Sequence, residues 1–481
     1  MLVGMDHRSN IPDAVPKASS DPLPEISAFL EPFAPLFRRS QSRHSLERYI
    51  TGLLTYLDRK NCDTISAALA GTSTERLQHL LTDADWDSRQ LDGARVRSLS
   101  ARSPKGGVLV LDDTSFPKQG KASVGVARQY CGALGKRANC QVVVSAEYVA
   151  EEPESSRPLH WPVCARLYLP EGWATDPQRR ERAHVPEEVG FRIKPQIALS
   201  LVDLSREWEV PFEVVVADSG YGDNPSFLKG LEERKVAYVC RVESTFGVCR
   251  PEEVRAAKEA GAPPYKGRGQ PPKERPAPLY TAKEVIGSLP DGAWQTVSWR
   301  EGTKGTLSKQ MVALRAHRAT GSPRHSTTHD RVVTAAEGWL IAERPLVRPA
   351  GKEPGEEDLK YYYSSLGADV SPARLTTLAH SRGAIEQFYE DAKGECGLRD
   401  YQGRRWDGLH RHLALSMVAY SFLMLQSSVT ASEDSTSGEA FSPLVQAHDA
   451  AGDPQAGDGV VARRHGAVVH RNRSDKDLSP S

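Results

Sequence analysis

The chain combines stretches in which apolar residues recur at helical spacing with short, uninterrupted apolar runs. From Ser45 to Leu57 apolar residues return every three or four positions, which predicts an amphipathic helix. Two shorter helices should follow, the first capped by Asn61 or Asp63 and the second capped by Thr74. A pair of short helices around a turn is compatible with a helix-turn-helix, but an ordinary helical bundle is the simpler interpretation.

Apolar runs rich in Val and Leu predict the strands of a sheet. Val108–Leu111 and Val214–Ala217 contain no polar residue, which is typical of strands buried on both faces. Four further strands are expected at Ala122–Tyr130, Gln141–Val149, Val163–Leu169 and Val236–Cys240. Two helices are expected as well, one at Pro186–Arg206 with a kink at Pro195 and one at Pro225–Arg234. This order of elements is that of a ribonuclease-H-like core that still lacks its last helix.

The stretch from Arg241 to Ala379 is too long for a loop and predicts an inserted subdomain. Its strand-like segments are Thr296–Arg300, Gln310–His317, Gly338–Glu343 and Lys360–Leu366, which make the insertion β-rich. A closing apolar helix is expected at Gly408–Leu425, with His410 and His412 on the surface. Beyond it the apolar periodicity disappears, so the tail is expected to be disordered.

The segment His380–Lys393 predicts one helix with two different sides. At about 100° per residue, Arg382, Glu386, Glu390 and Lys393 fall within about 80° of one another. The adjoining side is apolar and suits docking on a core, through Ile385, Phe388, Tyr389, Ala392 and Cys396. Gly394 and Gly397 offer a stop. By itself, the segment is simplest to explain as a surface helix with charge pairs one turn apart.

Both uninterrupted apolar runs end in carboxylates, Asp112–Asp113 after the first and Asp218 after the second. An Asp at the carboxyl end of such a strand lies at the rim of an open α/β sheet, where ligands bind. A turn or helix cap is the alternative, and Ser-Gly-Tyr-Gly after Asp218 makes it credible there. Together with Glu386, these strand-end residues favour a shared functional site.

Three carboxylates at one rim repel one another unless a cation lies between them. Hard oxygen ligands select Mg²⁺ or Mn²⁺. Two such ions, about 3.5–4 Å apart, can activate a water and stabilise the leaving oxygen in phosphodiester cleavage. Arg382 and Lys393 would then face scissile or flanking phosphates.

Composition limits these hypotheses without deciding between them. The 481 residues allow two or three domains and include equal numbers of basic and acidic residues, 62 each, so composition alone does not indicate a nucleic-acid binder. The seven cysteines form no Cys-x-x-Cys pair, which argues against a zinc site or a disulfide framework and for a reducing cytosol. No apolar run approaches a membrane span, and the polar N-terminus is unlike a signal peptide.

These motifs resemble those of the DDE transposases of bacterial insertion sequences, in the branch with a Tyr-x2-Arg-x3-Glu-x6-Lys signature. Arg382, Glu386 and Lys393 have the family's spacing, whereas Ala379 stands at the Tyr position. Asp112-Asp113-Thr114 through Lys118 resembles the first-aspartate motif, with Asp112 the better match and Asp113 the alternative. Asp218-Ser219-Gly220-Tyr221-Gly222 resembles the second.

The resemblance implies an α/β protein with a ribonuclease-H-like catalytic core, a β-rich insertion and an N-terminal helical domain. The corresponding boundaries are 1–24, a flexible lead; 25–105, helical and DNA-contacting; 106–241 and 379–426, the core; 242–378, the insertion; and 427–481, a disordered tail. The insertion would contact the DNA end. A truncation or frame change in the tail would put activity in doubt.

The catalytic and metal-binding residues implied are Asp112, Asp218 and Glu386, with Mg²⁺ or Mn²⁺ as two ions. Arg382, Lys393 and Lys118 would bind DNA phosphates. Further candidates are Asp113, Glu390, Trp299, Lys266 and Arg268. Lys266 and Arg268 belong to the run Lys266–Lys273, which is similar to an AT-hook but equally consistent with a solvated loop. Trp294, Trp299 and Trp339 should anchor the core, and a second hypothesis has one of them stacking on an unpaired base.

The leading hypothesis is therefore a cytoplasmic, nucleoid-associated insertion-sequence transposase that nicks double-stranded DNA at terminal inverted repeats. The freed 3′-hydroxyl would then carry out strand transfer, and the signature around Glu386 hints at a hairpin intermediate. Two ends must be held together, so a homodimer in the synaptic complex is expected, with no membrane partner. The alternatives are a plain metal-dependent nuclease of the same fold and an inactive or repurposed DNA-binding protein.

Overall fold

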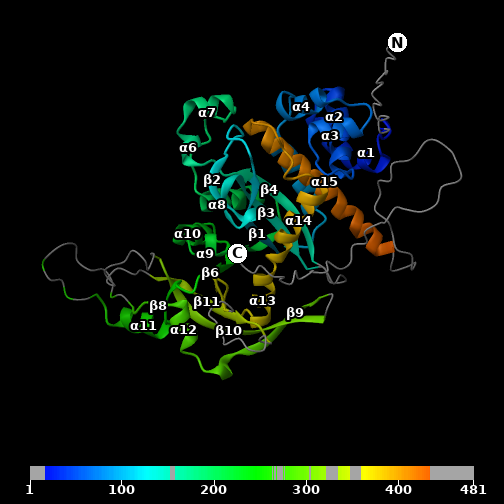
Figure 1. The fold of residues 1–481 in the computed structure, drawn as a ribbon. Helices are drawn as coiled ribbons and strands as arrows, with labels where there is room; N and C mark the ends of the chain where they lie inside the picture. The colour runs from blue at the N-terminus through cyan, green and yellow to red at the C-terminus, as the bar shows by residue number, and fades with distance from the viewer. Residues whose placement is uncertain are drawn as a thin grey trace, which may run out of the picture. The chain divides into compact units, whose positions relative to one another are not determined.

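A computed structural model describes residues 17–151, 158–262, 264, 267, 275, 277–302, 305–320, 334–346 and 359–433. The N-terminal part is helical, as predicted, with helices α1 Pro24–Leu30, α2 Ser40–Leu54, α3 Cys62–Ala68, α4 Thr74–Thr82 and α5 Ser88–Ser100 and a 3₁₀ turn at Glu31–Leu36 (Figure 1). Asn61 caps α3 with a capping box, but Ser73 rather than Thr74 caps α4.

The lead predicted to be flexible up to residue 24 is ordered from residue 17 onward. Ala18 forms a parallel bridge with Leu69, and Arg48 donates to the carbonyl oxygen of Ser19 at 2.9 Å. Arg48 is itself buried, and its guanidinium pairs with Glu47, which offsets the cost of burying the charge. The first part of the lead lies outside the described residues.

The described strands form a single twelve-stranded sheet with the order β2-β3-β1-β5-β6-β12-β11-β10-β7-β8, with β4 also on β3 and β9 also on β10. The first six are β1 Gly107–Pro117, β2 Ala127–Cys131, β3 Lys136–Ala150, β4 Leu159–Leu167, β5 Phe212–Ala217 and β6 Ala237–Val242. Strand β1 is antiparallel to β3 and parallel to β5, and β5 is parallel to β6. The fold is therefore α/β, and β1 lies between β3 and β5, with its two aspartates directly after its last pairing with β5.

The predicted insertion is β-rich and continues the core sheet. Its strands are β7 Gly247–Cys249, β8 Tyr280–Thr281, β9 Gln295–Gly302, β10 Gly305–Ala319, β11 Thr334–Arg344 and β12 Lys360–Ser364, with helices α11 Pro251–Glu259 and α12 Ala282–Gly287 and a 3₁₀ turn at Asp291–Ala293. Strand β12 pairs antiparallel with β6, so the two parts share backbone hydrogen bonds. All four strands expected here are present.

Short helices follow β4 and β5. They are α6 Glu171–Ala174, α7 Pro177–Arg182, α8 Lys194–Glu207, α9 Ser219–Gly222 and α10 Pro225–Glu233. The kinked helix predicted at Pro186–Arg206 is wrong in its first half, because α8 begins at Lys194 and Pro195 occupies its first turn. Proline is tolerated there since the first-turn N–H groups have no partner within the helix.

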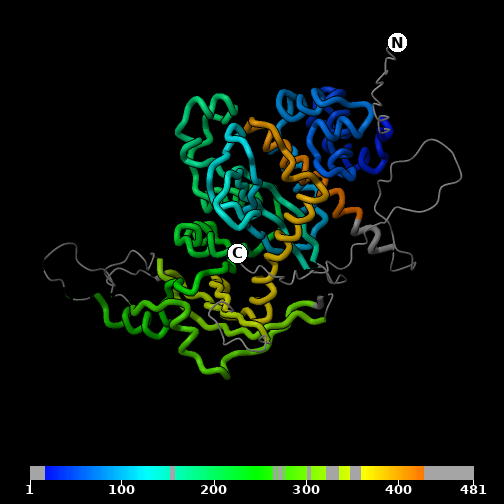
Figure 2. The backbone as a smooth tube through the Cα atoms, in the orientation of Figure 1, coloured from blue at the N-terminus to red at the C-terminus, as the bar shows by residue number. Residues whose placement is uncertain are grey.

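The helix predicted at His380–Lys393 is in fact two. Helix α13 spans Pro372–His380 and packs on β9, β6 and β10, whereas α14 spans Gly383–Glu395 and packs on β1, β4 and β3. Ser381 and Arg382 join them through tight turns, with Ala384 N–H bonded to Ser381 and Ile385 N–H to Arg382. Figure 2 follows the chain back from the insertion through this junction to the core.

The apolar side predicted for the helix that carries Glu386, here α14 and called the acidic helix, is confirmed. Its residues Ile385, Phe388 and Ala392 and the following Cys396 are all buried in the main core. Gly397 stops the helix with a φ of 63°, and the N–H of Leu398 bonds the carbonyl of Ala392.

The closing helix α15 spans Trp406–Glu433, beyond the predicted end at Leu425 and into the tail predicted to be disordered. His410 and His412 are buried rather than exposed, and His412 Nδ1 lies 2.8 Å from the hydroxyl of Tyr49 on α2. Burial lowers the pKa of both imidazoles to about 4, which keeps them neutral. The tail beyond residue 433 lies outside the described residues. No helix in the described part of the chain is long and apolar enough to span a bilayer.

Gly222 ends the motif Asp218–Gly222 where α9 meets β6. A Cβ at this position would lie 2.0 Å from the carbonyl oxygen of Arg241, a backbone atom that cannot move away. We expect Gly222→Ala to lower the free energy of unfolding by about 1–3 kcal/mol, the usual cost of overpacking. Gly172→Ala is the control, because a Cβ there meets nothing within 4 Å. Equal unfolding midpoints in urea for both variants would contradict this packing.

Candidate active site

Asp112 lies on β1 one residue past the last pairing of β1 with β5. Leu111 pairs with Ala217, the residue before Asp218, so the two aspartates follow neighbouring parallel strands at one edge of the sheet. Asp112 is buried, with an exposed fraction of 6%. One of its oxygens, Oδ1, accepts the N–H of Asp113 at 2.8 Å, which fixes the orientation of the carboxylate.

Asp218 stands at the N-terminus of α9 but does not act as a side-chain cap. Its Oδ1 is buried without a hydrogen-bond partner among the described residues. Gly220 leaves this oxygen room, since a Cβ at position 220 would lie 3.2 Å from it. By position Asp218 is the N-cap residue of α9, and the backbone N–H groups of Gly220 and Tyr221 act to lower the pKa of its carboxyl, so the cap alternative stays open. The free Oδ1 supports a functional role as well, because a buried carboxylate oxygen without a donor is costly and such atoms often mark a ligand position.

Arg382 joins the first strand to the acidic helix. Its Nη2 donates to Asp112 Oδ2 at 2.9 Å, and its Nη1 donates to Glu386 Oε1 at 2.8 Å. The guanidinium is thus the cation between carboxylates that the sequence requires. Glu386 is the most exposed member, with 61% of its side chain accessible. The structure brings Asp112, Asp218, Arg382 and Glu386 to one place although they are remote in sequence.

The pKa values follow from burial and charge. Burial raises the pKa of Asp112 to about 7, with a smaller rise from Asp218, although Arg382 opposes both. Burial likewise raises the pKa of Asp218, against the influence of Arg382 and together with that of Asp113. Burial alone would lower the pKa of Arg382, but Asp112, Asp218 and Glu386 outweigh it and raise the pKa.

The donors suit a hard divalent cation, because they are carboxylate oxygens and one of them, Asp218 Oδ1, has no partner. However, no group of three or more His, Cys, Asp or Glu side chains in the described ranges is arranged to hold a metal ion. In this arrangement the guanidinium of Arg382 lies between Asp112 and Glu386 and pairs with both.

Comparisons with known proteins address the same residues. The family model described as DDE superfamily endonuclease matches residues 32–306, which include both aspartates. The chain belongs to this family. A second family model, the transposase DDE domain, matches residues 195–422 and includes Asp218 and Glu386.

A curated relative, the probable transposase for insertion sequence element IS701 from Microchaete diplosiphon, is 26% identical over 235 residues. The match covers 48% of this chain and 57% of that relative, so the alignment spans little more than half of the relative's length.

In this DDE-family chain Asp113, the alternative first aspartate, points away from the acidic helix. Consecutive strand residues face opposite sides, so α14 covers the Asp112 side and α8 the Asp113 side. Lys194 on α8 binds Asp113 at 2.8 Å, and the hydroxyl of Tyr221 donates to it at 3.3 Å. The geometry thus favours Asp112. Lys194 is a neighbour that sequence reasoning missed, because a single Lys before a Pro gives no signal.

The other cations of the motif occupy different positions. Lys393 lies over the ring of Tyr389, with Nζ 5.3 Å from its centroid, and burial lowers its pKa. Lys118 donates to the carbonyl oxygen of Tyr401, and burial lowers its pKa to about 8. Neither contacts the carboxylates, and Glu390 is exposed on α14. Their proposed roles toward phosphate stay predictions.

Sequence reasoning also missed a network on the insertion side of the junction. Trp299 on β9 stacks on His380, with ring centroids 4.0 Å apart, and His380 Nε2 lies 2.8 Å from Glu343 Oε2. Lys309 binds the other oxygen of Glu343 at 2.7 Å. Burial would raise the pKa of Glu343, but His380 and Lys309 lower it to about 2. This network fixes the end of α13 two residues before Arg382.

The three tryptophans of the insertion are half-buried and stack on cationic or imidazole side chains. Their prediction as core anchors is confirmed for Trp339, which packs against the main core, but not for Trp294 and Trp299. Arg344 lies over Trp294 at 4.2 Å and Arg315 over Trp339 at 4.8 Å. One face of Trp299 is occupied by His380. Lys266 and Arg268 lie outside the described residues. Ala379, at the Tyr position of the signature, is buried on α13.

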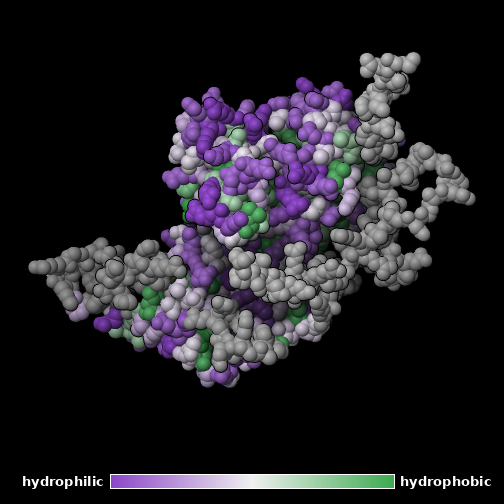
Figure 3. All heavy atoms as spheres, in the orientation of Figure 1, coloured by the Kyte–Doolittle hydropathy of each residue, from purple (hydrophilic) through white to green (hydrophobic). Residues whose placement is uncertain are grey.

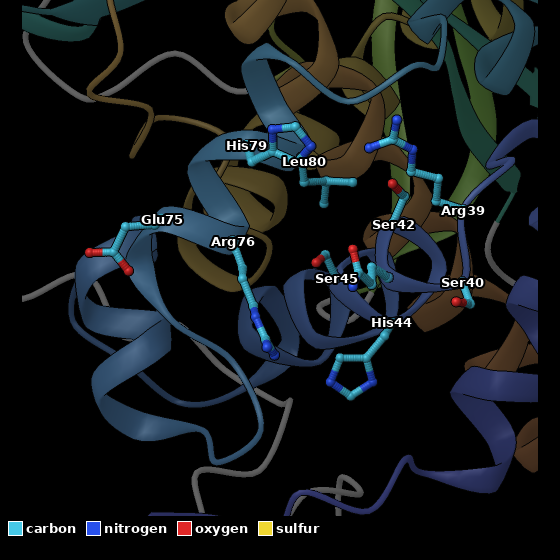
Figure 4. Close-up of a pocket in the computed structure, with 10 residues that line it drawn as sticks. Arg39, Ser40, Ser42, His44, Ser45, Glu75, Arg76, His79 and Leu80 are labelled. Atoms are coloured by element: carbon cyan, nitrogen blue, oxygen red, sulfur yellow. The ribbon is translucent and has the colours of Figure 1, made fainter.

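A separate pocket of about 480 Å³ lies between α2 and α4. Four basic or imidazole side chains contribute to its wall: Arg39, His44, Arg76 and His79. Figure 4 shows Glu75 directed away from Arg39 and His44. The pocket thus brings Arg39 and Arg76 near the first turn of α2, where free backbone N–H groups also favour anions.

The buried charge of Asp112 makes stability depend on pH. Its pKa rises from an ordinary 3.8 to about 7, so the carboxylate favours the folded state below pH 4 and loses this contribution as the pH rises to about 7. We expect Asp112→Asn to raise the free energy of unfolding of the metal-free protein at pH 8 by roughly 2–4 kcal/mol and to change it little at pH 4.

The exposed Asp58 supplies the control, because Asp58→Asn removes an aspartate that is not buried. Urea unfolding followed at both pH values measures the difference. A gain from Asp112→Asn that is the same at pH 4 and pH 8 would show that the buried charge is not its cause.

Proposed function

We propose that this DDE-family chain is an insertion-sequence transposase that cleaves DNA strands at terminal inverted repeats and carries out strand transfer. The observation that carries the proposal is the convergence of Asp112, Asp218 and Glu386 on Arg382 at one sheet edge. Family membership and the IS701 relative support it, although that relative is matched over only part of its length.

The catalytic core is, in this proposal, ribonuclease-H-like. Its support is the strand order β4-β3-β1-β5-β6, in which β3 and β4 are antiparallel and β5 and β6 run parallel to β1. Helix α14 then corresponds to the core's last helix, after the insertion. In this proposal Asp112, Asp218 and Glu386 belong to three different elements of the core and act at the same edge of the sheet.

Asp112, Asp218 and Glu386 would hold Mg²⁺ or Mn²⁺, as two ions. When bound, the ions would supply an activated water and neutralise charge on the leaving oxygen. Asp218 would bind through its free Oδ1. Asp112 would bind through its ionised carboxylate, whose charge is disfavoured by burial in the metal-free protein and would be compensated by the ion. In the protein alone, Arg382 supplies the compensating charge.

Arg382 has a second use once its carboxylates are engaged elsewhere. Its Nε is buried without a partner among the described residues, so one donor already lacks a bond. A guanidinium freed from Asp112 and Glu386 would offer a fork to a phosphate group next to the cut. Lys393, on the same helix, would add a point charge, because its ammonium is held by the weak contact with Tyr389.

The partner in this proposal is double-stranded DNA, held by a homodimer when two ends are paired. The basic pocket between α2 and α4 supports DNA contact by the N-terminal helices. The inactive or repurposed DNA-binding protein remains the second candidate, favoured by Ala379, which has no hydroxyl to offer a phosphate where the signature has Tyr.

Asp218→Asn tests the chemistry. The substitution keeps the shape but removes the charge, so Mg²⁺-dependent nicking of a terminal-repeat duplex should fall by roughly a hundredfold to a thousandfold or more. Binding of the same duplex, measured by gel shift, should stay close to wild type. Asp291→Asn, whose side chain is 95% exposed, should nick normally. Loss of binding by Asp218→Asn would instead identify a structural residue.

Paired ends separate a transposase from a plain nuclease. Two labelled terminal-repeat duplexes and a plasmid target, incubated with the full chain and Mg²⁺, should give joined end–target molecules. The freed 3′-hydroxyl is a nucleophile only if the protein holds end and target together. Nicked ends without joined molecules would reject transposition and keep the nuclease, and binding without nicks would favour the repurposed protein.

A further inference from the structure

The residues that follow the first aspartates form an unusually basic segment. From Thr114 to Ala146 the chain contains no Asp or Glu, whereas over its whole length basic and acidic residues are equal in number. The basic residues of the segment are Lys118, Lys121, Arg128, Lys136 and Arg137. All except Lys118 are exposed and have no ion-pair partner among the described residues. This segment therefore carries a local excess of positive charge, although the net charge of the whole chain is zero.

This segment folds as a two-stranded hairpin beside the carboxylate site. Beyond Leu111, β1 no longer pairs with β5 and continues beside β3 alone, and β2 pairs with the first half of β3. The hairpin tip returns to β1, since the N–H of Ala133 donates to Ser115 Oγ at 3.1 Å. Ser115 is three residues after Asp112, a separation of about 10 Å along a strand.

Two apolar side chains at the hairpin face solvent. Tyr130 is 63% exposed and Leu134 is 47% exposed, and both lie between basic residues. Figure 3 shows the surface over the region of β2 and α7 as mostly hydrophilic with isolated hydrophobic residues. Exposed aromatic and apolar side chains within a basic surface are a typical combination for packing against the sugars and bases of nucleic acid.

The hairpin is held by hydrogen bonds to backbone atoms, one of them a long bond of 3.4 Å from Arg137 Nη2 to the carbonyl oxygen of Arg128. Asn139 Nδ2 donates to the carbonyl oxygens of Lys118 and Gly120, both at 2.8 Å. The ring N–H of Trp173 donates to Val126, and the N–H of Val124 donates to Arg404. A surface that is already ordered loses little conformational entropy on binding.

We propose that residues 118–140, which comprise the segment leading into β2, the strand β2 and the first part of β3, form a DNA-backbone clamp that holds the duplex next to the scissile phosphate. This inference rests on the proposed function. Lys121, Arg128, Lys136 and Arg137 contact phosphates, while Tyr130 and Leu134 pack on the sugar edge. The hairpin tip meets β1 at Ser115, about 10 Å along the strand from Asp112, which corresponds to about three base pairs of B-DNA, so one duplex can extend from the carboxylates to the hairpin. A two-stranded ribbon also fits a groove of the duplex.

The clamp reads no sequence, because contacts to phosphate and sugar position the duplex without distinguishing bases. It should therefore bind terminal-repeat and arbitrary DNA alike. The alternative occupant of such a hairpin is a second copy of the chain. Charge argues for DNA, since a segment with five cations and no anion repels its own copy.

The test compares two pairs of exposed cations on the same strand system. Lys136→Gln with Arg137→Gln alters the hairpin, and Arg102→Gln with Lys105→Gln alters the opposite end of β1; all four residues are exposed. Binding of a short duplex of arbitrary sequence is measured by fluorescence anisotropy over a range of salt concentrations. Each lost phosphate contact lowers the slope of log affinity against log salt by about 0.9.

We expect the hairpin variant to lose about one to two units of that slope and about tenfold in affinity at low salt, with the control unchanged. Tyr130→Ser should weaken binding several-fold at unchanged slope, and Tyr130→Phe should restore it, because only the ring is needed. Circular dichroism and thermal melting of each variant confirm that these exposed positions leave the fold intact.

Two results would overturn the clamp while keeping the transposase. The first is a wild type that binds and nicks end DNA while the hairpin variant has the salt slope of the control. The second is a hairpin variant with altered oligomeric state in size-exclusion chromatography and unaltered salt slope, which would make the hairpin a protein contact. A wild type that neither binds nor cuts any duplex would reject the proposed function and the clamp together.

Discussion

The arrangement of this protein depends on how negative charge is tolerated at one edge of its sheet. Asp112 is buried and Asp218 partly so, each directly after the last pairing between β1 and β5, and burial makes ionisation of both unfavourable. The guanidinium of Arg382 compensates by binding Asp112 and, through its second nitrogen, Glu386. The members of this cluster are coupled, because the charge on each one changes the cost of ionising the others.

Arg382 can reach this position because of the break between α13 and α14. A continuous helix would carry the charged stripe straight from the insertion to the core. Instead α13 ends on the insertion strands, where Trp299, Glu343 and Lys309 hold His380, and α14 starts afresh on β1. The insertion thereby supports the acidic site from the opposite end of the junction, through a buried carboxylate that is fully paired. It is joined to the core by the β12–β6 pairing as well.

At the edge that carries the aspartates, the two faces of β1 have different surroundings. On one side of β1, Asp112 faces α14 and its cation; on the other, Asp113 faces Lys194 and Tyr221. Past the last pairing with β5, the strand continues into the basic hairpin. Acidic and basic surfaces thus follow each other along a single strand, which suits a polyanion that has to be attracted to the site and then brought against carboxylates. The net charge of zero hides this separation.

The sequence by itself determined the elements whose pattern is local. The apolar run ending in Asp placed Asp218 correctly at a strand end, whereas Asp112 lies within β1, which continues to Pro117 beside β3. Helical spacing placed Ile385, Phe388 and Ala392 correctly on the buried side of α14. Periodicity also found the insertion strands. These predictions succeeded because alternation and helical spacing depend on neighbours in the chain.

Tertiary structure alone decided the rest. The break at Ser381–Arg382, the start of α8 at Lys194 and the burial of His410 and His412 depend on which surfaces pack together. So does the choice of Asp112 over Asp113, which a strand pattern cannot make because both residues follow the same apolar run. Lys194 and the Glu343 network belong to the same class, since partners remote in sequence leave no periodic signal. The pKa and the role of a charged side chain depend on the groups that face it, and those groups come together only in the folded chain.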